Sequence, residues 1–151
     1  MPGIETSDGS FVLTGKALEA EGSAYTEAFA VKLSSTGTLQ ASWTSGLSSA
    51  SDAANAVIQL PSGGDLIIAG WRTVSGVGHR CITKLSLSDL SHVWTATFDD
   101  SSGSNGALEM ITLASDGVLL AGLRNKASLS EMSFKGVKGR KERSRPDDTA
   151  G

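Results

Sequence analysis

The sequence predicts an all-β fold built from antiparallel four-stranded units, the arrangement of the blades of a β-propeller. Three observations carry this prediction: a glycine-rich phrase occurs three times, other segments repeat with nearly the same period, and each repeated segment resembles a short strand. The phrase spans Ser7 to Gly15, Pro61 to Gly70 and Ala114 to Gly122, and its closing glycines are 55 and 52 residues apart. A period of this size indicates supersecondary units that stack on one another.

Three further blocks repeat with almost the same period. The matching pairs are residues 29–34 with 81–86, 42–44 with 93–95, and 56–60 with 109–113, at separations of 52, 51 and 53 residues. Four different blocks that keep one period indicate a true repeat, because chance similarity of a single glycine-rich turn would not extend to the other segments.

Each block has the pattern of a β-strand. Phe29, Val31 and Leu33 alternate with less apolar residues, which predicts one buried face. The phrases contain short continuous apolar runs at 11–13, 66–68 and 118–120, as expected for strands buried on both faces. Asp8-Gly9, Gly63-Gly64 and Asp116-Gly117 precede these runs at hairpin spacing and predict tight turns.

One full unit therefore reads as strand, glycine turn, strand, longer loop, strand, turn and a last strand with Trp. We assign residues 1–49 to a first blade that lacks most of its first strand, with Ile4 to Thr6 as the remnant. Residues 50–104 form a complete second blade, 105–134 a partial third blade, and 135–151 a basic, disordered tail. Residues 132–137 fall where a third strand is due and resemble a decayed copy of it.

The run Ser-Asp-Gly-Ser-Phe-Val-Leu-Thr-Gly, followed by Phe-Ala-Val-Lys-Leu-Ser-Ser-Thr-Gly-Thr-Leu and then a Trp, resembles the repeats of bacterial-type surface β-propellers. These belong to the broad quinoprotein-like propeller assembly, and the resemblance covers Ile4 to Leu123. It implies a propeller fold, an extracellular or cell-surface location, and a docking role between blades for Trp43 and Trp94. It implies no activity, because the cofactor-binding residues of quinoprotein enzymes have no counterpart here.

A propeller typically needs four to eight blades. We therefore expect this chain to be a fragment of a larger protein, or alternatively one protomer of a ring that other copies complete. Residues 1–123 carry five Lys and Arg against twelve Asp and Glu, and residues 124–151 carry eight against four. The acidic repeat region predicts no nucleic-acid partner, and we interpret the basic tail as a solvated terminus. The sequence shows no signal peptide and no membrane span.

Trp71 and Arg72 are the candidate binding residues. Trp71 stands where the other units have Lys16 and Leu123, so an aromatic residue occurs at this position in one unit only. A Trp beside an Arg can stack on a sugar or peptide, and the alternative is that Trp71 packs against the next blade. Cys81, the only cysteine, is expected to be a buried small hydrophobe, and an intrachain disulfide is excluded.

Other candidate sites are weaker. His79 and His92 should lie near opposite ends of one strand, too far apart to share a metal ion. The polar loop at 99–106 lacks the regular acidic spacing of a calcium site, so we interpret it as solvated. No Gly-x-Ser-x-Gly elbow supports a Ser-His-Asp triad.

These observations favour a non-catalytic scaffold or binding module, with a protein or glycan as partner and no cofactor. One alternative is a fragment of a propeller enzyme, either a quinoprotein-like oxidoreductase or a glycan-processing enzyme, with its active site in other blades. The weakest alternative is a degenerate fragment without a selected function.

Overall fold

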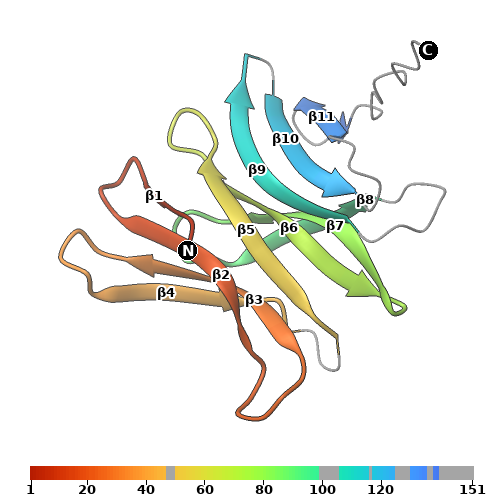
Figure 1. The fold of residues 1–151 in the computed structure, drawn as a ribbon. Coiled ribbons are helices and arrows are strands. Elements are labelled where there is room, and N and C mark those ends of the chain that lie inside the picture. Colours follow the sequence, from red (N-terminus) through yellow and green to blue (C-terminus); the bar gives the residue numbers. More distant parts are fainter. Residues whose placement is uncertain (47–49, 99–105, 116, 125–129, 136–137, 140–151) are drawn as a thin grey trace.

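In the computed structural model, the chain forms three antiparallel four-stranded sheets, each with its strands in sequence order (Figure 1). The structure describes residues 1–46, 50–98, 106–115, 117–124, 130–135 and 138–139. The first sheet contains β1 (Gly3–Glu5), β2 (Phe11–Leu18), β3 (Thr26–Leu33) and β4 (Leu39–Thr44). The second contains β5 (Asp52–Gln59), β6 (Leu66–Val74), β7 (Val77–Leu85) and β8 (His92–Phe98). The third contains β9 (Gly106–Ala114), β10 (Gly117–Arg124), β11 (Ser130–Lys135) and β12 (Lys138–Gly139).

The all-β prediction is confirmed, and the described residues contain no helix that could cross a membrane. The first strand of the first sheet, β1, has only three residues, Gly3–Glu5, where the sequence analysis placed the remnant at Ile4 to Thr6. The two residues of β12 lie inside the segment predicted to be a tail, whereas 140–151 and the polar loop at 99–105 lie outside the described residues.

The second sheet is buried on both faces by its neighbours. Because side chains alternate along a strand, Leu66 and Ile68 of β6 enter a core shared with the first sheet, and Ile67 and Ala69 enter a core shared with the third. The first sheet contributes Val12, Ala28 and Ala30 to the first core, and the third sheet contributes Leu108, Val118 and Leu120 to the second. The continuous apolar run of β6 is therefore explained by two-sided burial.

The turns are partly as predicted. Gly9 (φ 77°) and Gly63 (φ 71°) occupy the left-handed region in the turns before β2 and β6, where glycine carries no steric penalty. The predicted longer loop between the second and third strands is wrong for the second sheet. There Ser75 (φ 51°) and Gly76 (φ 79°) form a two-residue hairpin turn between β6 and β7, because both residues adopt the positive φ values that such a turn requires.

Strand register corrects one of the sequence alignments. Gln59 pairs with Leu66, and Leu113 pairs with the corresponding Val118, so Gln59 and Leu113 are counterparts 54 residues apart and not the 53 expected. A one-residue offset moves a side chain to the other face of the sheet. Val57, which is buried toward the first sheet, therefore corresponds to Ile111, which packs toward the second.

An ion pair occurs at equivalent places in the first two sheets. Lys32 Nζ on β3 lies 2.7 Å from Asp8 Oδ2, and Lys84 Nζ on β7 lies 3.3 Å from Asp65 Oδ2. Lys32 is buried and also donates a 2.8 Å hydrogen bond to the carbonyl of Leu87 in the second sheet's β7–β8 turn. The Lys32 ammonium holds the pKa of Asp8 well below its usual value, and the same group ties the two sheets together.

Candidate functional site

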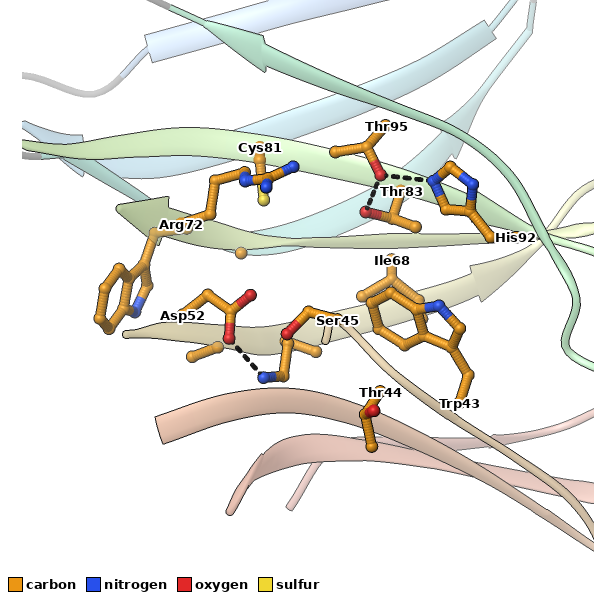
Figure 2. Close-up of a pocket in the computed structure, with 15 residues that line it drawn as sticks. Trp43, Thr44, Ser45, Asp52, Ile68, Arg72, Cys81, Thr83, His92 and Thr95 are labelled. Atoms are coloured by element: carbon orange, nitrogen blue, oxygen red, sulfur yellow. Dashed lines mark hydrogen bonds between the residues drawn. The ribbon is translucent and has the colours of Figure 1, made fainter. Parts of the chain in front are cut away.

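A cavity of about 450 Å³ lies between the first two sheets (Figure 2). Residues of β3 and β4 line it from the first sheet, and residues of all four strands of the second sheet line the opposite side. The lining includes two tryptophans and a series of polar residues together with one cysteine: Trp43, Ser45, Asp52, Trp71, Arg72, Cys81, Thr83, His92 and Thr95.

Asp52 anchors the polar end of the cavity. It is the first residue of β5, and its buried carboxylate accepts a 2.6 Å hydrogen bond from the backbone N–H of Ala28 on β3. Thr26 Oγ1 also donates to the Asp52 carbonyl over 3.0 Å, so this corner of the cavity is fixed by contacts between the two sheets. Burial raises the pKa of Asp52, although the Ser45 hydroxyl, the Ala28 N–H and the positive charge of Arg72 act in the opposite direction.

The same end contains a polar atom without a partner. Among the described residues, Arg72 Nε is a buried side-chain polar atom with no hydrogen-bond partner, and Arg72 lines this cavity. Buried polar atoms are normally hydrogen-bonded, so this exception needs a physical explanation. An unsatisfied guanidinium N–H at a cavity, close to the hydroxyl of Ser45, is a position where a bound polar molecule would accept a hydrogen bond.

The other end of the cavity carries a chain of hydroxyl groups. Thr83 Oγ1 and Thr95 Oγ1 are 2.9 Å apart, and His92 Nε2 lies 2.9 Å from Thr95 Oγ1. The indole of Trp43, from the first sheet, faces these polar groups of the second sheet across the cavity (Figure 2). This end therefore combines an aromatic surface with polar groups.

Strand register explains why Trp43 lines the cavity. Trp94 pairs with Lys84, whereas Trp43 pairs with Ala30, and the residue opposite Lys32 is Ala41. Trp43 thus lies two residues beyond the position on β4 that corresponds to Trp94 on β8. An offset of two residues preserves the face of the sheet, so both tryptophans still pack against a core between sheets. The offset leaves the small Ala41 at the position equivalent to Trp94.

The structure separates the side chains of the two predicted binding residues. Trp71 and Arg72 both line the cavity, but adjacent residues of a strand point to opposite faces of the sheet. Arg72 shares the face of Ile68 and directs its guanidinium toward Cys81 (Figure 2), whereas the half-buried Trp71 belongs to the other face of β6. Of this pair, Arg72 is the residue that reaches into the cavity.

Cys81 is buried and free, as the sequence predicted. Burial raises the pKa of its thiol to about 12, which keeps it protonated at neutral pH. Cys81 therefore contributes to the cavity wall as a small apolar group and not as a nucleophile.

The histidines lie as expected, near opposite ends of the β7–β8 pair: His79 is close to the start of β7, and His92 pairs with its last residue, Leu85. The described residues contain no cluster of three or more His, Cys, Asp or Glu that could hold a metal. Ser45, Asp52 and His92 line one cavity, but the imidazole contacts Thr95 and the carboxylate contacts Ala28. These contacts are not those of a proton relay through a catalytic triad.

Sequence reasoning missed Ser45, Asp52, Thr83 and Thr95 as site residues. Each is an ordinary polar residue in its own segment, and only the packing of two sheets brings them together. A usable signal was present in Asp52, an acidic residue that begins a strand otherwise rich in Ala and Val.

No family model matches this chain, and no curated protein matches it closely enough to indicate a relationship. Its function must therefore be inferred from its own residues and their geometry.

Proposed function

We propose that this chain is a non-catalytic binding module of the β-propeller type, and that the cavity between its first two sheets binds a sugar ring. The observation that carries the proposal is the unpartnered buried atom Arg72 Nε at a cavity that Asp52 and Trp43 also line. In this interpretation each sheet is one blade, and the location is extracellular or at the cell surface.

The sheet arrangement supports the assignment to blades. Each sheet is a simple antiparallel meander of four strands, which is the unit of a propeller blade. The first strand of each later sheet packs against the sheet before it, since β5 contacts β1, β2 and β3, and β9 contacts β5, β6 and β7. Such packing of successive sheets against one another is what neighbouring blades require.

The chemistry of the cavity suits a sugar. Sugar hydroxyls both donate and accept hydrogen bonds, and the C–H face of the ring packs on aromatic side chains. Asp52 supplies an acceptor, Arg72 a donor, and Ser45 and the Thr83–Thr95 pair supply hydroxyls. The volume of about 450 Å³ falls within the range of about 300–1,000 Å³ that is usual for small-molecule sites.

The alternative of a propeller enzyme fragment receives less support from these residues. General acid–base chemistry needs titratable groups positioned around one reacting atom. Here Asp52 is held by the Ala28 N–H, His92 contacts Thr95, and the Cys81 thiol is protonated at neutral pH. An oxidoreductase or glycan-processing activity would therefore need residues beyond this cavity.

The test is a screen of the full chain against immobilised neutral and acidic glycans, followed by calorimetric titration of the sugars that bind. Arg72→Gln and Ser45→Ala should each weaken binding by about tenfold or more, since each removes one hydrogen-bonding group worth about 1.5 kcal/mol. Lys16→Gln, at an exposed position of β2, is the matched control and should bind normally. Absence of sugar binding, or full binding by Arg72→Gln, would refute the proposal.

A further inference from the structure

Asp52 and Arg72 place an acceptor and a donor side by side at the polar end of the cavity. They are directly opposite each other in the register of β5 and β6, so their side chains leave the same face of the second sheet. Other contacts orient the two groups: the Asp52 carboxylate accepts the Ala28 N–H, and the Arg72 guanidinium lies toward Cys81 (Figure 2). Because Arg72 Nε has no hydrogen-bond partner, its donor is available to a bound molecule.

The charges of these two residues cancel. Among the described residues that line the cavity, Asp52 is the one carboxylic acid and Arg72 the one arginine, and no lysine occurs there. A charged ligand at this end therefore meets a like charge as well as an opposite one. Juxtaposed like charges are a means by which a binding site rejects the wrong partner, so the cavity offers a charged ligand no net attraction.

Hydroxyl groups satisfy this acceptor and donor together, whereas a carboxylate satisfies only one of them. A hydroxyl both accepts and donates, so the hydroxyls of one ring can accept from Arg72 Nε and donate to the Asp52 carboxylate. An ionised carboxylate on the ligand only accepts. It could bond to Arg72, but it would leave Asp52 without a donor and would place a second negative charge beside it.

The other end of the cavity also suits hydroxyl groups. Thr83 Oγ1 and Thr95 Oγ1, which are 2.9 Å apart, are uncharged groups that donate and accept as sugar hydroxyls do. Trp43 lines the cavity from the first sheet, where its indole can pack against the C–H face of a ring. Both ends therefore provide partners for an uncharged ring with several hydroxyls.

We infer that the cavity selects uncharged sugars over acidic sugars, and that Asp52 is the residue that determines this specificity. The inference rests on the proposed function, since it names the class of sugar that the same cavity takes. Arg72 can donate to a sugar of either class. Asp52 discriminates between the classes, because its carboxylate accepts from a hydroxyl and repels a carboxylate.

The experiment is calorimetric titration of the full chain and two variants at pH 8 with matched pairs of sugars. The pairs are the methyl glycosides of glucose, galactose and mannose, each with its uronic acid, in which a carboxylate replaces the hydroxymethyl group. Asp52→Asn removes the charge but keeps an oxygen that can accept the Ala28 N–H. Glu5→Gln is the matched control, because it removes a negative charge at an exposed position of β1 outside the cavity. Circular dichroism of each variant establishes that it retains the β structure of the parent.

We expect the parent and Glu5→Gln to bind the neutral member of a pair about tenfold or more tightly than its uronic acid. Asp52→Asn should lose most of this preference, because the neutral sugar loses a charged acceptor and the uronic acid is no longer repelled. A uronic acid that binds the parent as tightly as its neutral partner overturns the inference and leaves sugar binding in place. A preference that Asp52→Asn retains in full overturns the role of Asp52. Absence of binding by all six sugars contradicts both the inference and the proposed function.

Discussion

Replacing Gly70 by Ala should destabilise the second sheet strongly, although Gly70 has an ordinary strand conformation. A Cβ added at Gly70 would lie 1.9 Å from the carbonyl oxygen of Ala53, 3.0 Å from its carbonyl carbon and 3.2 Å from Ala54 Cα. The close approach arises because the register of β5 and β6 shifts between Ala54 and Ala56. A bulge of this kind bends one strand over its partner.

The size of the effect follows from these distances. Ordinary contact begins at 3.4 Å, so the Ala53 carbonyl would have to move by about 1.5 Å, the difference between 3.4 and 1.9 Å. Overpacking in a core typically costs about 1–3 kcal/mol, and a displaced strand also loses backbone hydrogen bonds worth about 1 kcal/mol each. The restricted unfolded chain of an Ala variant offsets about 0.4–1 kcal/mol. We expect a net loss of about 3 kcal/mol.

Gly15→Ala is the matched control, because Gly15 closes the same phrase in the first sheet. Its Cβ would meet two atoms of the Phe29 ring at 3.0 Å and Met1 Cγ at 3.9 Å. The half-buried Phe29 ring lies on the face of the first sheet that points away from the second sheet, where it can turn. We expect a loss of less than about 1 kcal/mol. Urea unfolding followed by far-ultraviolet circular dichroism gives both values. Equal losses for the two variants, or a loss below about 0.5 kcal/mol for Gly70→Ala, would refute the close-approach argument.

Three further predictions concern buried polar groups. Lys32→Met should reduce the free energy of unfolding by about 2 kcal/mol, mainly because the Leu87 carbonyl loses its charged donor, and urea unfolding would contradict this if the variant matched the parent. The same variant should lose less stability in acid than the parent does. Lys32 lowers the pKa of Asp8, so the parent loses the stabilisation from the ionised Asp8 as pH falls below the usual value of 3.8. Burial raises the pKa of Asp52 above 3.8, so ionisation of this carboxyl destabilises the folded state. The stability of the parent should therefore fall as pH rises through the raised pKa. Thermal unfolding of Asp52→Asn over a pH series should not show this fall. Cys81 should resist thiol reagents in the folded protein and react only after unfolding in urea, because its pKa is about 12 and it is buried; rapid labelling of the native chain would contradict its placement.

The strands could be predicted because their information is local. Alternation at Phe29, Val31 and Leu33 and the apolar run at 66–68 each identify a strand without knowledge of its neighbours. Register could not be predicted in the same way. The shift between Ala54 and Ala56 changes which residues share a face, and nothing in the local composition of β5 marks it.

The candidate site was less predictable than the fold, because it is assembled from two sheets. The hydrogen bond from Ala28 to Asp52 joins residues 24 positions apart in the sequence, and it depends on how the sheets pack. Arg72 was identified because it adjoins a Trp that breaks the repeat, but the expected partnership with Trp71 ignored the alternation of side chains along β6.

The features that depart from the repeat are also the ones that form the cavity. Arg72 pairs with Asp52 in the second sheet, whereas the register of the third sheet places Gly106 opposite Arg124. The carboxylate therefore occurs at the interface between the first and second sheets and has no counterpart at Gly106. Trp43 is likewise displaced by two residues from the position that Trp94 occupies in its sheet. Residues that occur in every repeat maintain the contact between sheets at both interfaces. A function specific to one interface must therefore depend on residues that the other interface lacks. Gly106 is the residue at the third-sheet position equivalent to Asp52. Asp52→Gly should therefore abolish sugar binding if that binding depends on the interface between the first two sheets. Unchanged binding by this variant would show that sugar binds at another site.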